Sequence, residues 1–207
     1  MIPVGRVRQP RGFSQVTLDG DAWVVANPTA KRQKDLWSDY LSKLAAGFHG
    51  LCGYTATYDS AGGTVDHYLS WKNHPTKAYR WGNYRYAMHW VNAKKGTEDE
   101  QILDPFEVGE GWFEIVLPSL QLIATTKIPA ANRARAEFTL KKLGLRDGEK
   151  AIRTRLAWYG TYLSGDLPLA GLDVVAPLIA AAVTRDNIKP TVSPAAAVAR
   201  RPTKAKK

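Results

Sequence analysis

Three polar positions in the middle of the chain carry side chains that could perform hydrolytic chemistry. Asp66 and His67 are adjacent, Asn83 lies sixteen positions after His67, and Asn92 lies nine positions after Asn83. A neutral imidazole is well suited to take a proton from water at physiological pH. Carboxylate and amide oxygens are ligands that Mg²⁺ and Mn²⁺ prefer. These residue types favour a general base beside a divalent cation, although an Asp-His pair alone is usually a hydrogen-bonded structural feature.

The elements that would position these residues follow from the hydrophobic pattern. Apolar side chains at helical spacing predict an amphipathic helix over residues 34–48. Residues 51–58 and 64–69 are rich in aromatic and β-branched residues and flank a Gly-rich turn, which predicts a β-hairpin. Residues 84–95 contain no helix breaker and predict a short helix with basic residues in its last turn. The expected order is strand, strand, loop, helix.

With this order, the spacing of the polar positions resembles that of the HNH endonucleases. Their ββα-metal core carries Asp-His on a strand, Asn in the following loop, and His or Asn on the helix. Three flanking motifs are also similar to those of HNH proteins that continue past the core with an Asp-Pro-Phe turn: Asn73-His-Pro75, Ala78-Tyr-Arg-Trp-Gly-Asn83 and Leu103-Asp-Pro-Phe106. The resemblance covers about residues 51–107 and implies an α+β fold, with a ββα-metal core set among additional α-helices.

The resemblance implies a role for each polar position. His67 would be the general base that activates the attacking water, and Asn83 would orient its imidazole through a hydrogen bond. Asp66 and Asn92 would hold Mg²⁺ or Mn²⁺, which neutralises the developing charge. Neighbouring residues on a strand point to opposite faces, so Asp66 and His67 can serve one site only if the strand bends.

The chain departs from the usual HNH pattern in two ways. Many HNH proteins hold the core with two Cys-x-x-Cys pairs around zinc, but the matching positions here read Cys52-Gly-Tyr-Thr55 and Met88-His-Trp-Val91. We therefore expect no structural zinc, and a core held by apolar packing through Tyr54, Met88 and Trp90. Asn92 stands where His is commoner, and its neutral, hard oxygen favours Mg²⁺ over Zn²⁺.

Other polar residues near these positions have several alternative roles. Four basic residues could contact flanking phosphates, although any one of them alone fits a solvated surface charge: Arg80, Arg85, Lys94 and Lys95. His89, three residues before Asn92, is a rival metal ligand. His74 is expected in a loop, His49 at a helix end, and Cys52 in the core.

The remainder of the chain carries no motif of a known family. Residues 1–50 are predicted to hold extended structure followed by the first helix. Residues 108–186 are predicted to complete the same domain, with one strand at 112–117 and three helices at 130–143, 149–163 and 172–184. The last segment, residues 187–207, contains six Lys or Arg residues, no acidic residue and much Pro and Ala. It is predicted to be a disordered basic tail that attracts phosphates or serves only as a solubilising end.

The hydrophobic content, the net charge and the cysteine count of the chain limit the classes of protein to which it can belong. The 207 residues are 44% hydrophobic and carry a formal net charge of +10, which fits a folded protein that binds nucleic acid. The single cysteine excludes a disulfide framework, and the apolar runs are too short to cross a membrane, so a cytoplasmic location is expected.

The predicted function is a metal-dependent endonuclease, with DNA favoured over RNA as its substrate. The alternative is a catalytically inactive subunit that binds nucleic acid or a protein partner within a larger defence or mobile-element complex.

Overall fold

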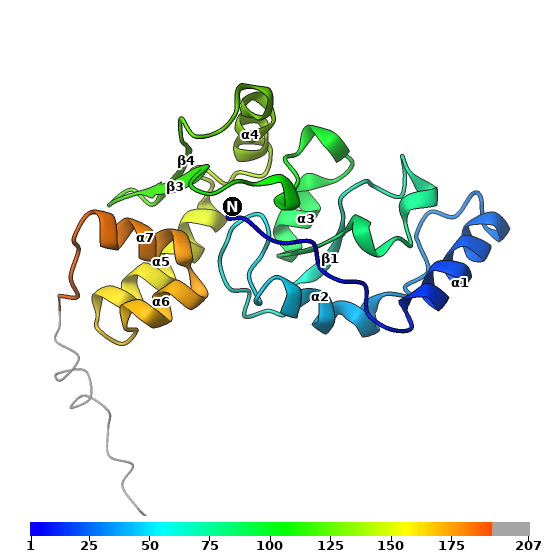
Figure 1. Ribbon diagram of the computed structural model, residues 1–207, viewed down its shortest axis with the longest axis horizontal. Coiled ribbons are helices and arrows are strands. Elements are labelled where there is room, and N and C mark those ends of the chain that lie inside the picture. Colours follow the sequence, from blue (N-terminus) through cyan, green and yellow to red (C-terminus); the bar gives the residue numbers. More distant parts are fainter. Residues whose placement is uncertain (192–207) are drawn as a thin grey trace, which may run out of the picture.

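The computed structural model describes residues 1–191 as a mixture of helices and two small antiparallel sheets, in keeping with the predicted α+β class (Figure 1). The described helices are α1 (Phe13–Ala26), α2 (Leu41–Gly47), α3 (His89–Lys95), α4 (Ala130–Lys142), α5 (Glu149–Leu163), α6 (Leu169–Val175) and α7 (Pro177–Arg185). The strands are β1 (Thr64–His67), β2 (Tyr84–Ala87), β3 (Phe113–Val116) and β4 (Gln121–Ala124). Figure 1 shows α1 at one end of an elongated molecule, β3, β4 and α5–α7 at the other, and β1, α2 and α3 between them.

The central unit consists of β1, β2 and α3. The two strands are antiparallel, and their register places Asp66 opposite Arg85 and His67 opposite Tyr84. All four residues of β2 are buried, as expected for a strand covered on both faces. The helix α3 starts two residues after β2 and packs against β1. This unit therefore contains two strands and a helix, as expected, and β1 and α3 lie within their predicted ranges, but the second strand comes from a different segment.

The predicted hairpin is wrong. Residues 51–58 form a compact loop closed by a single bridge between Leu51 and Tyr58, and the partner of β1 comes from the first part of the predicted helix at 84–95. The local sequence of residues 84–87 lacks helix breakers, but pairing with β1 buries the aromatic residues Tyr84 and Tyr86. Tertiary pairing thus overrides local propensity, and a long loop, residues 68–83, replaces the expected tight turn.

The N-terminal segment also differs from its prediction, because α1 occupies residues that were expected to be extended. Gly20 lies in the middle of this helix, where its lack of a side chain lets α1 approach the buried ring of Tyr79. Thr17 Oγ1 donates a hydrogen bond to the Tyr79 carbonyl (2.9 Å) at the same contact. Gly20 is thus a packing requirement of α1. The predicted helix over residues 34–48 shortens to a 3₁₀ turn at Ser38–Tyr40 followed by α2.

Two hydrophobic clusters hold the molecule together. The first joins α1, α2, β1 and β2 through Phe13, Leu44, Val65 and Tyr84. The second joins the region after β2 to the C-terminal helices, and it includes the following residues of the central unit: Cys52, Tyr54, Ala87, Met88 and Val91. Tyr54, Met88 and Cys52 are buried as predicted, and Trp90 packs at the edge of the second cluster.

The C-terminal half follows its predictions more closely. The strand β3 and the helices α4 and α5 lie where they were expected, while β4 was not predicted and the last helix is divided by Pro177 into α6 and α7. Ile188 and Thr191 form hydrogen bonds with α5 residues, so the first part of the predicted tail packs on the fold. The rest of the tail prediction, residues 192–207, falls outside the described residues.

Within residues 1–191, no helix has both the length and the apolar character needed to cross a bilayer.

Gly20→Ala should lower the free energy of unfolding by about 1–3 kcal/mol, the usual cost of overpacking. The added Cβ would lie 2.1 Å from Cγ of Tyr79. Gly160→Ala is the matched control, because a Cβ at this position in α5 meets no atom within 4 Å. This second change should raise stability by about 0.5–1 kcal/mol. Urea denaturation of both variants measures the difference, and equal shifts would contradict the packing role of Gly20.

Candidate active site

A pocket of about 530 Å³ lies where the end of β1 meets α3. Three of the predicted site residues, Asp66, His67 and Asn92, line it. The other lining residues come from the loop after α1, the loop after β1 and the end of α3: Ala30, Lys31, Ser70, Trp71, Lys72, Gly96 and Thr97. Asp66 and His67 both line this pocket although they are neighbours on a strand, and His67 is the last residue of β1.

His67 is held between two aromatic rings. Its imidazole packs edge-to-face on Trp37, with ring centroids 4.7 Å apart, and on Tyr84, at 4.9 Å. Its Nε2 atom is buried and has no hydrogen-bond partner among the described residues. Burial lowers the pKa of His67 from 6.5 to about 4, an effect that the nearby carboxylate of Asp66 opposes in part. The imidazole is therefore neutral at physiological pH, the state in which it can accept a proton.

Asp66 belongs to a buried polar network. The Tyr54 hydroxyl donates a hydrogen bond to Asp66 Oδ2 (2.6 Å), and the ammonium group of Lys95 lies 3.0 Å from Asp66 Oδ1. Lys95 Nζ also donates to the His67 carbonyl (2.7 Å), and its side chain is fully buried. Burial, together with the charge of Asp66, raises the pKa of Tyr54 well above its ordinary value, so the phenol keeps its proton and remains a donor.

Asn92 lies one turn before Lys95, on the same face of α3. Its Nδ2 atom donates to the Val65 carbonyl (3.2 Å), so Asn92 and Lys95 together fasten the helix to the backbone of β1. Asn92 Oδ1 accepts no hydrogen bond from the described residues, and this oxygen belongs to a pocket-lining side chain. The arrangement leaves one amide oxygen and one carboxylate as hard oxygen donors near His67.

Asn83 does not form the predicted hydrogen bond with His67. Its Oδ1 atom accepts from the Leu69 N–H (2.8 Å), and its Nδ2 atom donates to the carbonyls of Leu69 (2.9 Å) and Lys77 (3.0 Å). The amide is thus fully used in binding the backbone of the loop that follows His67. Asn83 is a positioning residue for this loop and does not orient the imidazole.

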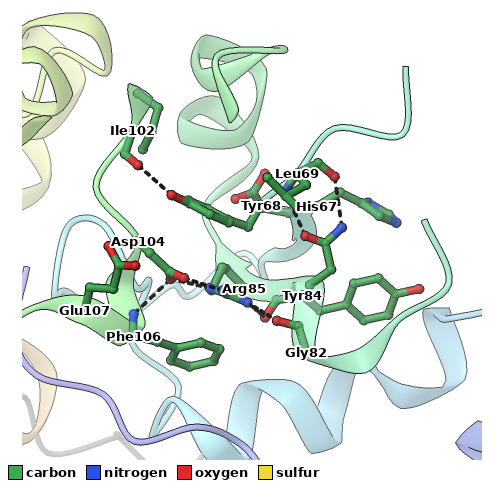
Figure 2. A network of polar contacts seen from close by, with 12 residues as sticks. His67, Tyr68, Leu69, Gly82, Tyr84, Arg85, Ile102, Asp104, Phe106 and Glu107 are labelled. Atoms are coloured by element: carbon green, nitrogen blue, oxygen red, sulfur yellow. Dashed lines mark hydrogen bonds and ion pairs between the residues drawn. The ribbon is translucent and has the colours of Figure 1, made fainter. Parts of the chain in front are cut away.

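Arg85 and Lys95 also differ from their prediction as phosphate-binding residues, because both are buried. The guanidinium of Arg85 forms two hydrogen bonds of 2.6 Å with Asp104 and lies 3.9 Å from the ring centroid of Phe106. Figure 2 shows this ion pair beneath Tyr68, with the His67 imidazole pointing away from it. Arg85 joins the Asp-Pro-Phe turn to β2 and is not accessible to a nucleic acid.

The other two basic candidates lie on the surface but outside the pocket. Arg80 forms a bidentate ion pair with Asp21 of α1 (2.8 and 2.9 Å). Lys94 is exposed, and its ammonium group lies 5.8 Å from the ring centroid of Trp90. His89, the rival metal ligand, is exposed and lines a different hollow, together with Tyr58 and other residues. These side chains therefore do not converge on Asp66 and Asn92.

Several residues that line the pocket or contact His67 escaped the sequence analysis. Trp71 and Lys72 follow His67 closely, and that proximity was the only available signal for them. Lys31 and Trp37 lie in the loop between α1 and α2, thirty or more positions before His67, and nothing in the local pattern marks them. The chain segment before residue 51, which carries no motif, forms one wall of the pocket.

Neither a protein-family model, nor a curated protein, nor a solved structure matches the chain. Within residues 1–191, no group of three or more His, Cys, Asp or Glu side chains is placed to hold a metal ion. Asp66 and Asn92 do not make such a group, because Asn92 is an amide and only one of the two residues belongs to these four types. A functional assignment therefore depends on the geometry of the pocket and on the residue types that line it.

Lys95→Met should lower the free energy of unfolding by about 3–5 kcal/mol, because it leaves the buried carboxylate of Asp66 without its partner charge. Lys94→Met is the matched control, since Lys94 is the exposed neighbour on the same helix and surface changes usually stay within about 0.5 kcal/mol. Urea denaturation at constant pH measures both. Similar small losses in the two variants would show that the Asp66–Lys95 pair is not a structural constraint.

His67 should make stability depend on pH between about 6.5 and 4. In this window the unfolded chain binds a proton at His67 and the folded chain, whose pKa is lowered to about 4, does not. The contribution of His67 is therefore fully present above pH 6.5 and is lost as the pH falls through the folded pKa. Urea denaturation at pH 7 and pH 5 should show a larger loss for the wild-type chain than for His67→Gln, and an equal loss would contradict the burial of a neutral imidazole.

Proposed function

We propose that the chain is a metal-dependent endonuclease of the HNH type that hydrolyses phosphodiester bonds of DNA. One observation carries the proposal: Asp66, His67 and Asn92, which the HNH spacing singles out, line a single pocket at the junction of β1 and α3. The antiparallel strands followed by a helix that packs on β1 support it, because this is the order of a ββα-metal core. The lysines that line the pocket add a positive charge suited to a phosphate.

The neutral imidazole of His67 would act as the general base. It takes a proton from a water molecule while the water oxygen attacks phosphorus, and the bond from phosphorus to the leaving oxygen breaks, with this oxygen protonated by solvent. The aromatic contacts with Trp37 and Tyr84 restrict rotation of the ring. The hydrogen bond from Lys95 to the His67 carbonyl fixes the backbone beneath it. Positioning of this kind is a large part of what an enzyme contributes to hydrolysis.

Asp66 and Asn92 would hold Mg²⁺ or Mn²⁺, since their donor atoms are oxygens of the kind that such an ion prefers. A carboxylate offers about four lone-pair directions, of which Tyr54 and Lys95 take one on each oxygen, and Asn92 Oδ1 is not bonded to the described protein. Mg²⁺ commonly binds with one or two protein oxygens and completes its shell with water and phosphate. When bound, the ion neutralises charge on the phosphate and the leaving oxygen. Lys95 would lower the affinity of this carboxylate for the cation, because its ammonium group lies beside the same carboxylate.

A second candidate is a catalytically inactive subunit that keeps the fold and binds nucleic acid or a protein partner. The covering of His67 by Trp37, and the burial of Nε2, favour this alternative, because a base must reach its water. Binding of DNA without cleavage under all metal conditions would select it.

His67→Ala should reduce hydrolysis of plasmid and oligonucleotide DNA by roughly 10²–10⁴-fold in the presence of Mg²⁺, as expected for the loss of a general base. His89→Ala is the matched control and should retain activity, because His89 is exposed and lines a different hollow. Cleavage should also stop when EDTA is added and resume with excess Mg²⁺ or Mn²⁺. Nicking and cleavage are followed on gels, and full activity of the His67→Ala protein would remove the proposed mechanism.

A further inference from the structure

Trp71 differs from the other tryptophans in its surroundings. Of the seven tryptophans, five pack in or against the two hydrophobic clusters: Trp37, Trp81, Trp90, Trp112 and Trp158. Trp23 pairs with the ring of Tyr79. Within residues 1–191, Trp71 is the only tryptophan that belongs to neither cluster and forms no aromatic pair. Its side chain is partly exposed and lines the pocket beside His67. A large aromatic side chain that serves no core is available to a ligand.

The loop that carries Trp71 is held on both sides by one carboxylate. Asp99 accepts hydrogen bonds from the Ser70 N–H (2.6 Å) and hydroxyl (3.2 Å) before Trp71, and from the Asn73 amide (2.6 Å) after it. His74 lies 3.4 Å from the same carboxylate. Although burial alone would raise the pKa of Asp99, its hydrogen bonds with Ser70 and Asn73 lower it, so Asp99 is ionised. The indole is thus carried by a preorganised loop, which reduces the entropy cost of binding a ligand.

The charge of the pocket is positive. Lys31 and Lys72 both line it, both are exposed, and neither has a carboxylate within 4.0 Å among the described residues. The only acidic side chain in the lining is Asp66, whose charge is balanced by the buried ammonium of Lys95. Two unpaired cations in the same pocket as an aromatic face match a ligand that combines phosphates with a planar base.

We propose that Trp71 stacks on an unpaired base while Lys31 and Lys72 hold adjacent phosphates, so that the preferred substrate is a single-stranded or locally unpaired stretch of nucleic acid. In an intact duplex the base faces are covered by their neighbours, and an indole beside the site has no face to contact. The pocket volume, about 530 Å³, lies in the range of small-ligand sites and admits one extruded nucleotide. Cleavage of that strand rests on the proposed nuclease function, whereas its binding does not.

The test compares binding of the full chain to fluorescent oligo-dT and to a dA·dT duplex of equal length, measured by anisotropy in EDTA so that no strand is cut. The wild-type chain should bind oligo-dT more tightly. Trp71→Ala should weaken oligo-dT binding by roughly 5- to 150-fold, which corresponds to the 1–3 kcal/mol of one base–aromatic stack, while duplex binding changes little. Trp71→Phe should recover most of the affinity, and Trp23→Ala is the matched control that should bind as the wild type does.

The lysines provide a second readout. Lys72→Ala should weaken binding of both nucleic acids and reduce the slope of log affinity against log salt by about 0.7 for each phosphate of the single strand that Lys72 no longer neutralises. Preference for the duplex, or equal weakening on oligo-dT and duplex in Trp71→Ala, would overturn the proposal. Trp71-dependent binding of oligo-dT without any cleavage in Mg²⁺ would support it while removing the nuclease function. Cleavage of duplex DNA that does not depend on Trp71 would leave the nuclease and remove this inference.

Discussion

The ammonium group of Lys95 lies in the interior of the protein, where α3 crosses the end of β1. It satisfies one backbone carbonyl, that of His67, and one carboxylate, that of Asp66. A buried charge of this kind is tolerated only if it is paired and hydrogen-bonded, so the positions of the helix and the strand are tied to each other. The location of His67 and Asn92 relative to Asp66 follows from this constraint, because His67 directly follows Asp66 on β1 and Asn92 lies one turn before Lys95 on α3.

Other polar networks hold the loops that surround this junction. Asn83 binds the backbone just after His67, Asp99 binds the loop around Trp71, and the Arg85–Asp104 pair joins β2 to the Asp-Pro-Phe turn. In each case a side chain satisfies backbone groups or a charge that burial would otherwise leave unpaired. The residues that resembled catalytic or phosphate-binding groups in the sequence are therefore partly the framework of the pocket. These hydrogen bonds and ion pairs hold the loops in place, and with them the pocket side chains that have no partner in the protein.

The two lysines and the indole that remain free face the same hollow as His67. Part of the wall comes from the loop between α1 and α2, which also places Trp37 against the imidazole. The N-terminal segment thus does two things for the pocket, since Trp37 helps to bury His67, whose pKa is lowered by burial, and Lys31 supplies a cation. A site assembled in this way depends on contact between segments that are far apart in the chain.

By itself, the sequence predicted the helices α4 and α5 and the strand β3 from local hydrophobic periods, and its resemblance to the HNH endonucleases implied the α+β class and the buried positions of Tyr54 and Met88. It also singled out Asp66, His67 and Asn92, since their spacing is visible without a fold. The tertiary structure alone decided that β2 pairs with β1, that residues 13–26 form a helix against Tyr79, and that Arg85 and Lys95 are interior charges. Contacts between distant segments decide which strands pair and whether a lysine is buried beside a carboxylate. No local pattern of residues contains that information.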